Sequence, residues 1–181
     1  MLALVLCLFV REAWTMPTNG DLEEVVKSAY VDRGLVSRHL IDVNGGVVEY
    51  LESGAMYSKT VLFCHGASFS ADTWQYVGVL DALAEHGTRA IALNLPGRGK
   101  TTPALRRSTF LATFCKARNI SGEDLYVVAA SMGGSFALPF IFEYRSVAGY
   151  VTVAGVLGAE NRGLTFANPV LAIYGELDPR F

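Results

Sequence analysis

Short, continuous apolar runs alternate with longer segments of helical character along most of this chain. The apolar runs are residues 61–64, 89–95, 125–129, 147–156 and 170–174, and helices are expected over residues 71–86, 104–117 and 132–144. Strands that are apolar throughout and are separated by helices are typical of parallel sheets covered on both faces. The alternation therefore predicts an α/β fold with a mostly parallel sheet.

A hairpin is expected ahead of the parallel part. Asn44 and Gly45 stand between two strand-like runs, residues 36–43 and 46–52. Asn-Gly in this setting favours a tight hairpin turn because both residues tolerate positive φ. Organised structure is therefore expected to begin near residue 36, with residues 21–35 as a lead-in and residues 36–181 as one domain.

Composition supports a single compact domain and limits the partners. The chain has 181 residues, of which 51% are hydrophobic and 18% charged, and its formal net charge is -2 without long like-charge runs. We therefore expect no nucleic-acid partner. Cys7, Cys64 and Cys115 form no C-x-x-C pair, so neither a disulfide scaffold nor a zinc site is expected. No metal or cofactor is implied.

The first twenty residues have the character of a signal peptide or an apolar leader. The apolar run over residues 2–10 is well short of the ~20 residues that span a bilayer, so no transmembrane span is expected. No Lys or Arg precedes the run, and Arg11 follows it. Asn119 lies in a glycosylation pattern that matters only on the secretory route. Secretory and cytoplasmic locations both stay open.

Ser131 is the candidate nucleophile. It lies between the expected strand 125–129 and the expected helix 132–144, in the sequence A-A-S-M-G-G. A nucleophile elbow is a sharp strand-to-helix turn that needs small residues two before and two after the serine. Ala129 and Gly133 meet that need. A serine that simply caps the helix is the alternative interpretation.

A second loop is suited to oxyanion binding. His65, Gly66, Ala67 and Ser68 follow the expected strand 61–64, and the backbone N–H groups of Ala67 and Met132 are the expected donors to the developing oxyanion. We expect the ring of His65 to orient this loop rather than act as a base. His39 and His86 are expected to be surface or packing residues.

An acid is expected after the run 170–174. Asp178 would stand on the loop at the end of that strand, where an acid can orient a histidine and stabilise its cation. Glu176 is the fallback acid, and a turn before Pro179 is the plainer interpretation of Asp178. All three histidines of the chain precede Ser131.

Taken in order, four segments resemble the α/β-hydrolase superfamily, and within it the small abhydrolase-domain-14 group. The segments read C-H-G-A-S-F-S-A-D-T-W-Q, A-L-N-L-P-G-R-G, A-A-S-M-G-G-S-F-A-L-P-F and L-A-I-Y-G-E-L-D-P. The resemblance covers roughly residues 36–179 and implies a serine hydrolase with Ser131 as nucleophile and Asp178 as acid. Asn94 stands where many relatives carry Asp, which we interpret as a change that stabilises the turn and has little catalytic meaning.

The resemblance also implies what this chain would lack. The histidine of the family follows one further strand, so the last strand, the last helix and the catalytic histidine are expected to lie beyond Phe181. The segment between residues 156 and 170 is too short for a helical lid. This favours an open site for short acyl esters or amides, impaired in the chain as given.

Two other functions stay open. Without a histidine base, the chain could be an inactive hydrolase-like protein that binds a ligand or a protein partner. Separately, residues 94–101 fit the phosphate-loop pattern G-x-x-x-x-G-K-[ST], except that Asn94 replaces the first glycine and Pro103 follows Thr101 closely. Proline disfavours the helix that such a loop needs.

Overall fold

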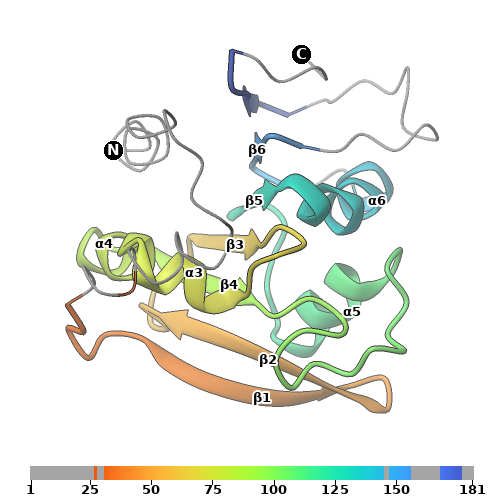
Figure 1. The fold of residues 1–181 in the computed structure, drawn as a ribbon, viewed down its shortest axis with the longest axis horizontal. Helices are drawn as coiled ribbons and strands as arrows, with labels where there is room; N and C mark the ends of the chain where they lie inside the picture. The colour runs from red at the N-terminus through yellow and green to blue at the C-terminus, as the bar shows by residue number, and fades with distance from the viewer. Residues whose placement is uncertain (1–26, 28–30, 145–146, 156–167, 177–181) are drawn as a thin grey trace.

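The structure is a computed structural model that describes residues 27, 31–144, 147–155 and 168–176 (Figure 1). The expected leader, residues 1–20, and the expected acid Asp178 lie outside the described residues. The elements are β1 (Ser37–Val43), β2 (Gly46–Ser53), β3 (Thr60–Cys64), α3 (Ala71–Tyr76), α4 (Val79–Glu85), β4 (Arg89–Leu93), α5 (Phe110–Ala117), β5 (Leu125–Ala130), the 3-10 turn η1 (Ser131–Gly133), α6 (Gly134–Tyr144), β6 (Gly149–Val153) and β7 (Val170–Ile173).

The described strands form one seven-stranded sheet in the order β1-β2-β4-β3-β5-β6-β7. Strand β2 pairs antiparallel with β1 and with β4. Strands β4, β3, β5, β6 and β7 are parallel to one another. The predicted mostly parallel α/β sheet is therefore confirmed. Because the parallel strands all end at the same edge, the loops that follow β3, β4 and β5 meet there.

Helices cover both faces of the sheet, with α3 and α4 together and α5 and α6 together (Figure 1). Along β3 the side chains alternate, so that Leu62 joins the core under α5 and α6 while Phe63 joins the core under α3 and α4. Trp74 packs on Phe63 with ring centroids 4.9 Å apart, and Phe114 packs on the other face. This two-sided burial explains why β3 is apolar throughout.

The predicted hairpin is confirmed. Asn44 and Gly45 have φ values of 50° and 78°, and Val43 pairs with Gly46 across the turn. Positive φ at both central residues matches the right-handed twist of the flanking strands, which explains the Asn-Gly sequence.

Two predicted helices have different bounds in the structure. The helix expected over residues 71–86 is split into α3 and α4, because Gly78 adopts a left-handed φ of 74° and donates its N–H to Gln75 O. Gly87, which directly follows the expected range, has a φ of 72°. The helix expected over residues 104–117 begins only at Phe110, since turns occupy the residues after Pro103.

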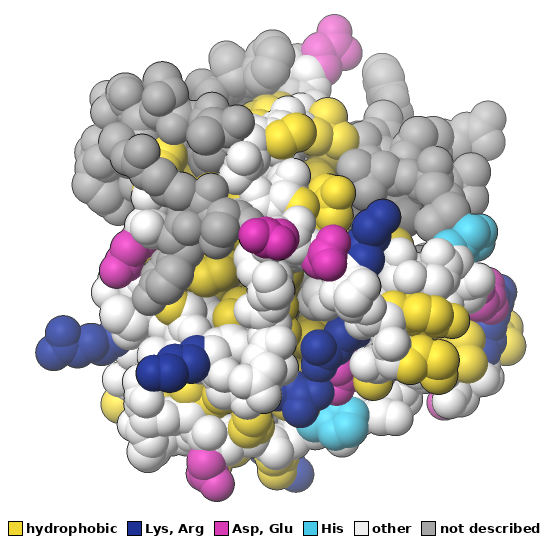
Figure 2. Space-filling view, turned by 180° about the vertical axis from the view of Figure 1, so that it is seen from behind, with side chains coloured by type: hydrophobic (Ala, Val, Ile, Leu, Met, Phe, Trp, Pro, Cys, Tyr) yellow, Lys and Arg dark blue, Asp and Glu magenta, His cyan; other side chains and the backbone are white. Residues whose placement is uncertain are grey.

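Among the described residues, no helix has both the length and the apolar character needed to cross a membrane. On the face that Figure 2 shows, Lys and Arg side chains alternate with Asp and Glu rather than forming a continuous basic surface. Strand β7 is the edge of the described sheet, and its Val170 and Leu171 are exposed.

Candidate active site

Ser131 lies at the apex of a sharp turn between β5 and α6. Ala130 is still extended, with φ -100° and ψ 130°, whereas Gly134 is helical. Between them Ser131 has a φ of 45°, in the left-handed region that a residue with a Cβ rarely adopts. Such a conformation costs about 1–2 kcal/mol and persists only where the surroundings enforce it. This is the strained geometry that the sequence predicts for a nucleophile elbow.

Close packing against β3 enforces the turn. A Cβ added to Gly133 would lie 2.6 Å from the carbonyl oxygen of Cys64, the last residue of β3. Ala129, on the other side of the serine, is fully buried. The space therefore requires glycine at position 133, as the elbow pattern predicts. The nucleophilic role of Ser131 stays a prediction.

The loop after β3 runs beside Ser131. A Cβ added to Gly66 would lie 3.6 Å from the Cβ of Ser131 and 3.3 Å from the ring of Phe69. Phe69 donates its N–H to Gly66 O at 3.2 Å, which closes a tight turn. The two predicted oxyanion donors are Ala67 and Met132. The structure brings the loop that contains Ala67 next to Ser131, which directly precedes Met132.

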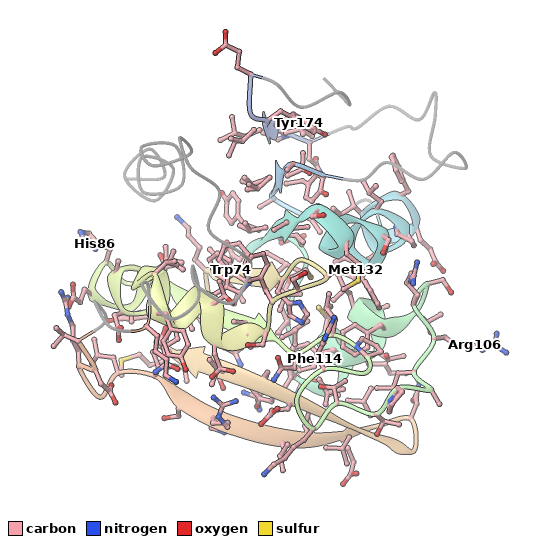
Figure 3. The ribbon with its side chains drawn as sticks, in the orientation of Figure 1. Trp74, His86, Arg106, Phe114, Met132 and Tyr174 are labelled. Carbon is pink, nitrogen blue, oxygen red and sulfur yellow. The ribbon has the colours of Figure 1, made fainter. Side chains whose placement is uncertain are left out.

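Met132 and Ala67 are each fixed through their carbonyl groups. The hydroxyl of Ser135 donates to Met132 O at 2.7 Å, and the Arg98 guanidinium donates to Ala67 O. Met132 lies where the elbow faces the middle of the molecule (Figure 3). The oxyanion roles predicted for the N–H groups of Met132 and Ala67 stay predictions.

His65 is a buried, neutral histidine with both ring nitrogens engaged. Its Nε2 accepts the N–H of Leu95 at 3.1 Å, so its Nδ1 carries the proton and donates to Gly66 O at 2.7 Å. Burial lowers the pKa of His65, and the positive charge of Arg98 adds to this effect, while the bond to Gly66 opposes it. The ring therefore ties the loop to the residues after β4, as expected, and offers no free nitrogen to Ser131.

The other two histidines lie elsewhere. The ring of His39 stacks on Tyr50 of β2 with centroids 5.1 Å apart. His86 follows α4, where its Nδ1 bonds Ala82 O at 2.7 Å, and in Figure 3 it is far from Met132. Both are surface or packing residues, as the sequence predicts.

The turn that follows β4 is tied to β2. The Nδ2 of Asn94 donates to the Glu49 carboxylate at 2.7 Å, and its Oδ1 accepts the N–H of Ala71 at 2.9 Å. The N–H of Lys100 donates to the same Glu49 carboxylate at 2.8 Å. No helix begins at Lys100. The Lys100 N–H, which a phosphate loop would direct at its ligand, instead donates to the Glu49 carboxylate. These contacts weigh against nucleotide binding.

The acidic side of the site is described only in part. Asp178 lies outside the described residues, and Glu176 is exposed beyond β7. Tyr174, at the end of β7, donates to Gly155 O at 3.4 Å and so links the ends of β6 and β7 (Figure 3). The assignment of Asp178 or Glu176 as the acid stays a prediction.

Metal and thiol chemistry have little support at this edge of the sheet. The part of the chain that the structure describes holds no group of three or more His, Cys, Asp or Glu side chains able to bind a metal ion. Cys64 and Cys115 are free and buried. Burial raises the pKa of the Cys64 thiol and raises that of Cys115 to about 12, so neither is a reactive thiolate.

Comparison with known proteins agrees with this architecture. The sequence pattern described as the Alpha/beta hydrolase family matches residues 61–181. The chain belongs to the alpha/beta hydrolase family. It is 34% identical over 160 residues to ABHD14B of Rattus norvegicus, whose provisional name is protein-lysine deacylase; the match covers 80% of this chain and 75% of that protein.

Further relatives are similar over different shares of their length. Protein ABHD14A of Rattus norvegicus is 32% identical over 138 residues, which cover 72% of this chain and 57% of that protein. Among solved structures, a hydrolase from Thermoplasma acidophilum described as CIB-like has a TM-score of 0.70 and 20% identity, covering 78% of this chain and 74% of its own. At that identity the likeness shows the fold alone. This hydrolase chain thus resembles the ABHD14 proteins but spans only part of them.

Sequence reasoning missed one buried polar residue near the site. Glu49 lies in β2, a strand that the sequence marks only as half of a hairpin, and it is 4% exposed. Its partners Asn94 and Lys100 are some 45 to 51 positions away in the chain. A lone Glu in a strand carries no signal of such a contact. Asn94 in place of the usual Asp was the one available hint.

Proposed function

We propose that this alpha/beta hydrolase uses Ser131 as the nucleophile in acyl transfer. The observation that carries the proposal is the left-handed φ of 45° at Ser131, on a turn between β5 and α6. In this conformation Ser131, which is half-buried, lies at the carboxyl edge of the sheet beside the loop that contains Gly66 and Ala67. Two backbone N–H groups, of Ala67 and Met132, would stabilise the oxyanion that forms when a carbonyl is attacked.

The substrate class we propose is a short acyl ester or amide. The ester or amide carbonyl carbon would bond to Ser131 Oγ, the alcohol or amine would leave with a proton, and water would then release the acid. The name of the rat ABHD14B relative points to acylated lysine, an amide, as one candidate. Asp178, within residues 177–181, would be the acidic residue that orients a histidine base.

A fluorophosphonate probe tests the nucleophile directly. The probe bonds covalently to activated serine hydroxyls, and we expect mass mapping to find it on Ser131. Ser131→Ala should abolish the label. Ser58→Ala, which removes an exposed serine hydroxyl between β2 and β3, is the control and should keep it. Labelling that survives in Ser131→Ala would overturn the assignment.

A binding function without catalysis is the second candidate. His65 has both ring nitrogens engaged, and His39 and His86 contact Tyr50 and Ala82. We infer that none of these three histidines serves Ser131 as the base, and a serine hydroxyl without a base is a poor nucleophile at neutral pH. We accordingly propose that the 181-residue chain is labelled slowly and hydrolyses acyl esters weakly.

The two candidates make different predictions for an acetyl-lysine peptide. A weak hydrolase releases acetate in proportion to time, and release stops in Ser131→Ala. A binding protein raises its own melting temperature with peptide concentration, equally in the wild type and Ser131→Ala, and releases nothing. Rapid fluorophosphonate labelling of the 181-residue chain would contradict the proposed impairment.

A further inference from the structure

The loop from His65 to Ala71 is held at both of its ends by the residues that follow β4. At the first end, Leu95 donates its N–H to the Nε2 of His65 at 3.1 Å. At the other end, Ala71 donates its N–H to the Oδ1 of Asn94 at 2.9 Å. Adjacent residues, 94 and 95, therefore hold both ends of a loop whose Gly66 lies beside Ser131.

Asn94 is in turn held by Glu49. Its Nδ2 donates to Glu49 Oε2 at 2.7 Å, while its own N–H donates to Glu49 O at 3.0 Å. Asn94 is 1% exposed and Glu49 is 4% exposed. Buried hydrogen bonds to a charged group are short, strong and directional, so the orientation of the Asn94 side chain depends on Glu49.

The Glu49 carboxylate has further partners that keep it ionised. Lys100 donates its N–H to Oε2 at 2.8 Å, and Arg38 lies 3.3 Å from Oε1. Burial opposes ionisation, but these donors and the Arg38 charge outweigh it and lower the pKa of Glu49. Arg38 also pairs with Asp72 in the first turn of α3. The carboxylate is therefore a fixed acceptor. It is linked to Ala71 through Asn94 and to Asp72 through Arg38, at the start of α3.

The donor and acceptor roles in this series of hydrogen bonds require an amide side chain at position 94. One end of the side chain must donate to a carboxylate and the other must accept from a backbone N–H. An ionised Asp could accept but not donate. There is no spare room either, because a Cβ on Gly99 would lie 2.0 Å from Glu49 Oε2 and 2.3 Å from Asn94 Nδ2.

We propose that Glu49 and Asn94 are positioning residues for the oxyanion loop, acting on Ser131 chemistry through Ala71 and Leu95 without touching substrate. The proposal rests on the proposed function of Ser131. It predicts that loss of the Glu49 charge slows acyl transfer more than it destabilises the fold. A misplacement of about 1 Å in such a loop can cost up to about 100-fold in rate.

The experiment compares two buried glutamates of the same strand. Glu52 is also in β2 and also 4% exposed, but it pairs with Arg89 and Arg118 instead. We expect Glu49→Gln to lower the second-order rate of fluorophosphonate labelling at Ser131 by about 10-fold or more. The matched control Glu52→Gln should change that rate by less than about 2-fold, at a temperature where both variants stay folded.

Restoring the polarity provides a rescue. Asn94→Asp places two carboxylates in contact, so its labelling rate should fall steeply between pH 5 and pH 8, relative to wild type, as the shared proton is lost. In Glu49→Gln combined with Asn94→Asp, an amide again faces a carboxylate, and the carboxylate introduced at position 94 can still accept the N–H of Ala71. The double variant should recover at least part of the loss at pH 8.

Amide hydrogen exchange separates this proposal from the proposed function. If Ser131 is not labelled in the wild type, the function fails, yet Glu49→Gln should still speed exchange at Ala71 and Leu95 by about 10-fold, and Glu52→Gln should not. Equal labelling rates in wild type and Glu49→Gln, or unchanged exchange at Ala71 and Leu95, would overturn the positioning role. So would equal effects of the two glutamate variants.

Discussion

Replacing Gly133 with alanine should push the turn that carries Ser131 away from the end of β3. The new Cβ would lie 2.6 Å from Cys64 O, 2.9 Å from its carbonyl carbon and 3.0 Å from its Cβ. Optimal contacts of carbon are about 3.5–4.0 Å. Two of these atoms belong to the backbone of the central strand and the third, Cβ, is bonded directly to that backbone, so none of them can rotate aside. The turn must therefore move by up to about 1 Å.

The expected loss of stability follows from two opposed effects. Alanine in place of glycine normally favours the folded state by about 0.4–1 kcal/mol, because it restricts the unfolded chain. Overpacking of a tight site costs about 1–3 kcal/mol. We expect a net destabilisation of about 1–2 kcal/mol, which in a chain of this size lowers Tm by about 2–8 °C.

The assay pairs thermal unfolding with fluorophosphonate labelling of Ser131. Gly175→Ala is the control, because a Cβ at Gly175 meets no atom within 4 Å and its φ is not positive. The control should leave Tm unchanged or slightly higher. In Gly133→Ala we expect labelling to slow by about 10-fold or more, since the hydroxyl moves relative to the oxyanion loop. A Gly133→Ala variant as stable and as reactive as the wild type would refute the idea that the elbow is seated on Cys64.

Further predictions concern the strained serine, the buried histidine and the hairpin. Ser131→Gly should be more stable than Ser131→Ala by about 1 kcal/mol in urea unfolding, because glycine adopts φ 45° without strain; the reverse order would contradict the strain. The lowered pKa of His65 means that the unfolded state binds the proton more readily, so stability is complete above about pH 6.5 and is lost below it. Between pH 7.5 and pH 5.5 we expect a loss of about 1 kcal/mol at most that His65→Gln reduces, and an unchanged slope in that variant would point to another group. Gly45→Ala should cost about 1–2 kcal/mol through its φ of 78° alone, since no atom lies within 4 Å of the added Cβ; a neutral effect on Tm would speak against the turn.

The hairpin and the elbow were predictable because both depend on neighbours in sequence. Asn44-Gly45 selects its turn through the backbone preferences of two adjacent residues. The small residues around Ser131 likewise report a local crowding, and the structure identifies its source as Cys64. The split between α3 and α4 was missed, although Gly78 was visible, since glycine inside a helical pattern only lowers helix propensity.

The sequence alone determined the α/β alternation, the place of Ser131 on a strand-to-helix turn and the loop expected beside it, since each follows from local periodicity and residue size. The tertiary structure decided which groups touch across the fold. It placed the two ring nitrogens of His65 against Gly66 and Leu95, and Asn94 between Glu49 and Ala71. Apart from Gly66, which adjoins His65, these partners are tens of residues apart, and only the pairing of β2 with β4 and of β4 with β3 brings them together.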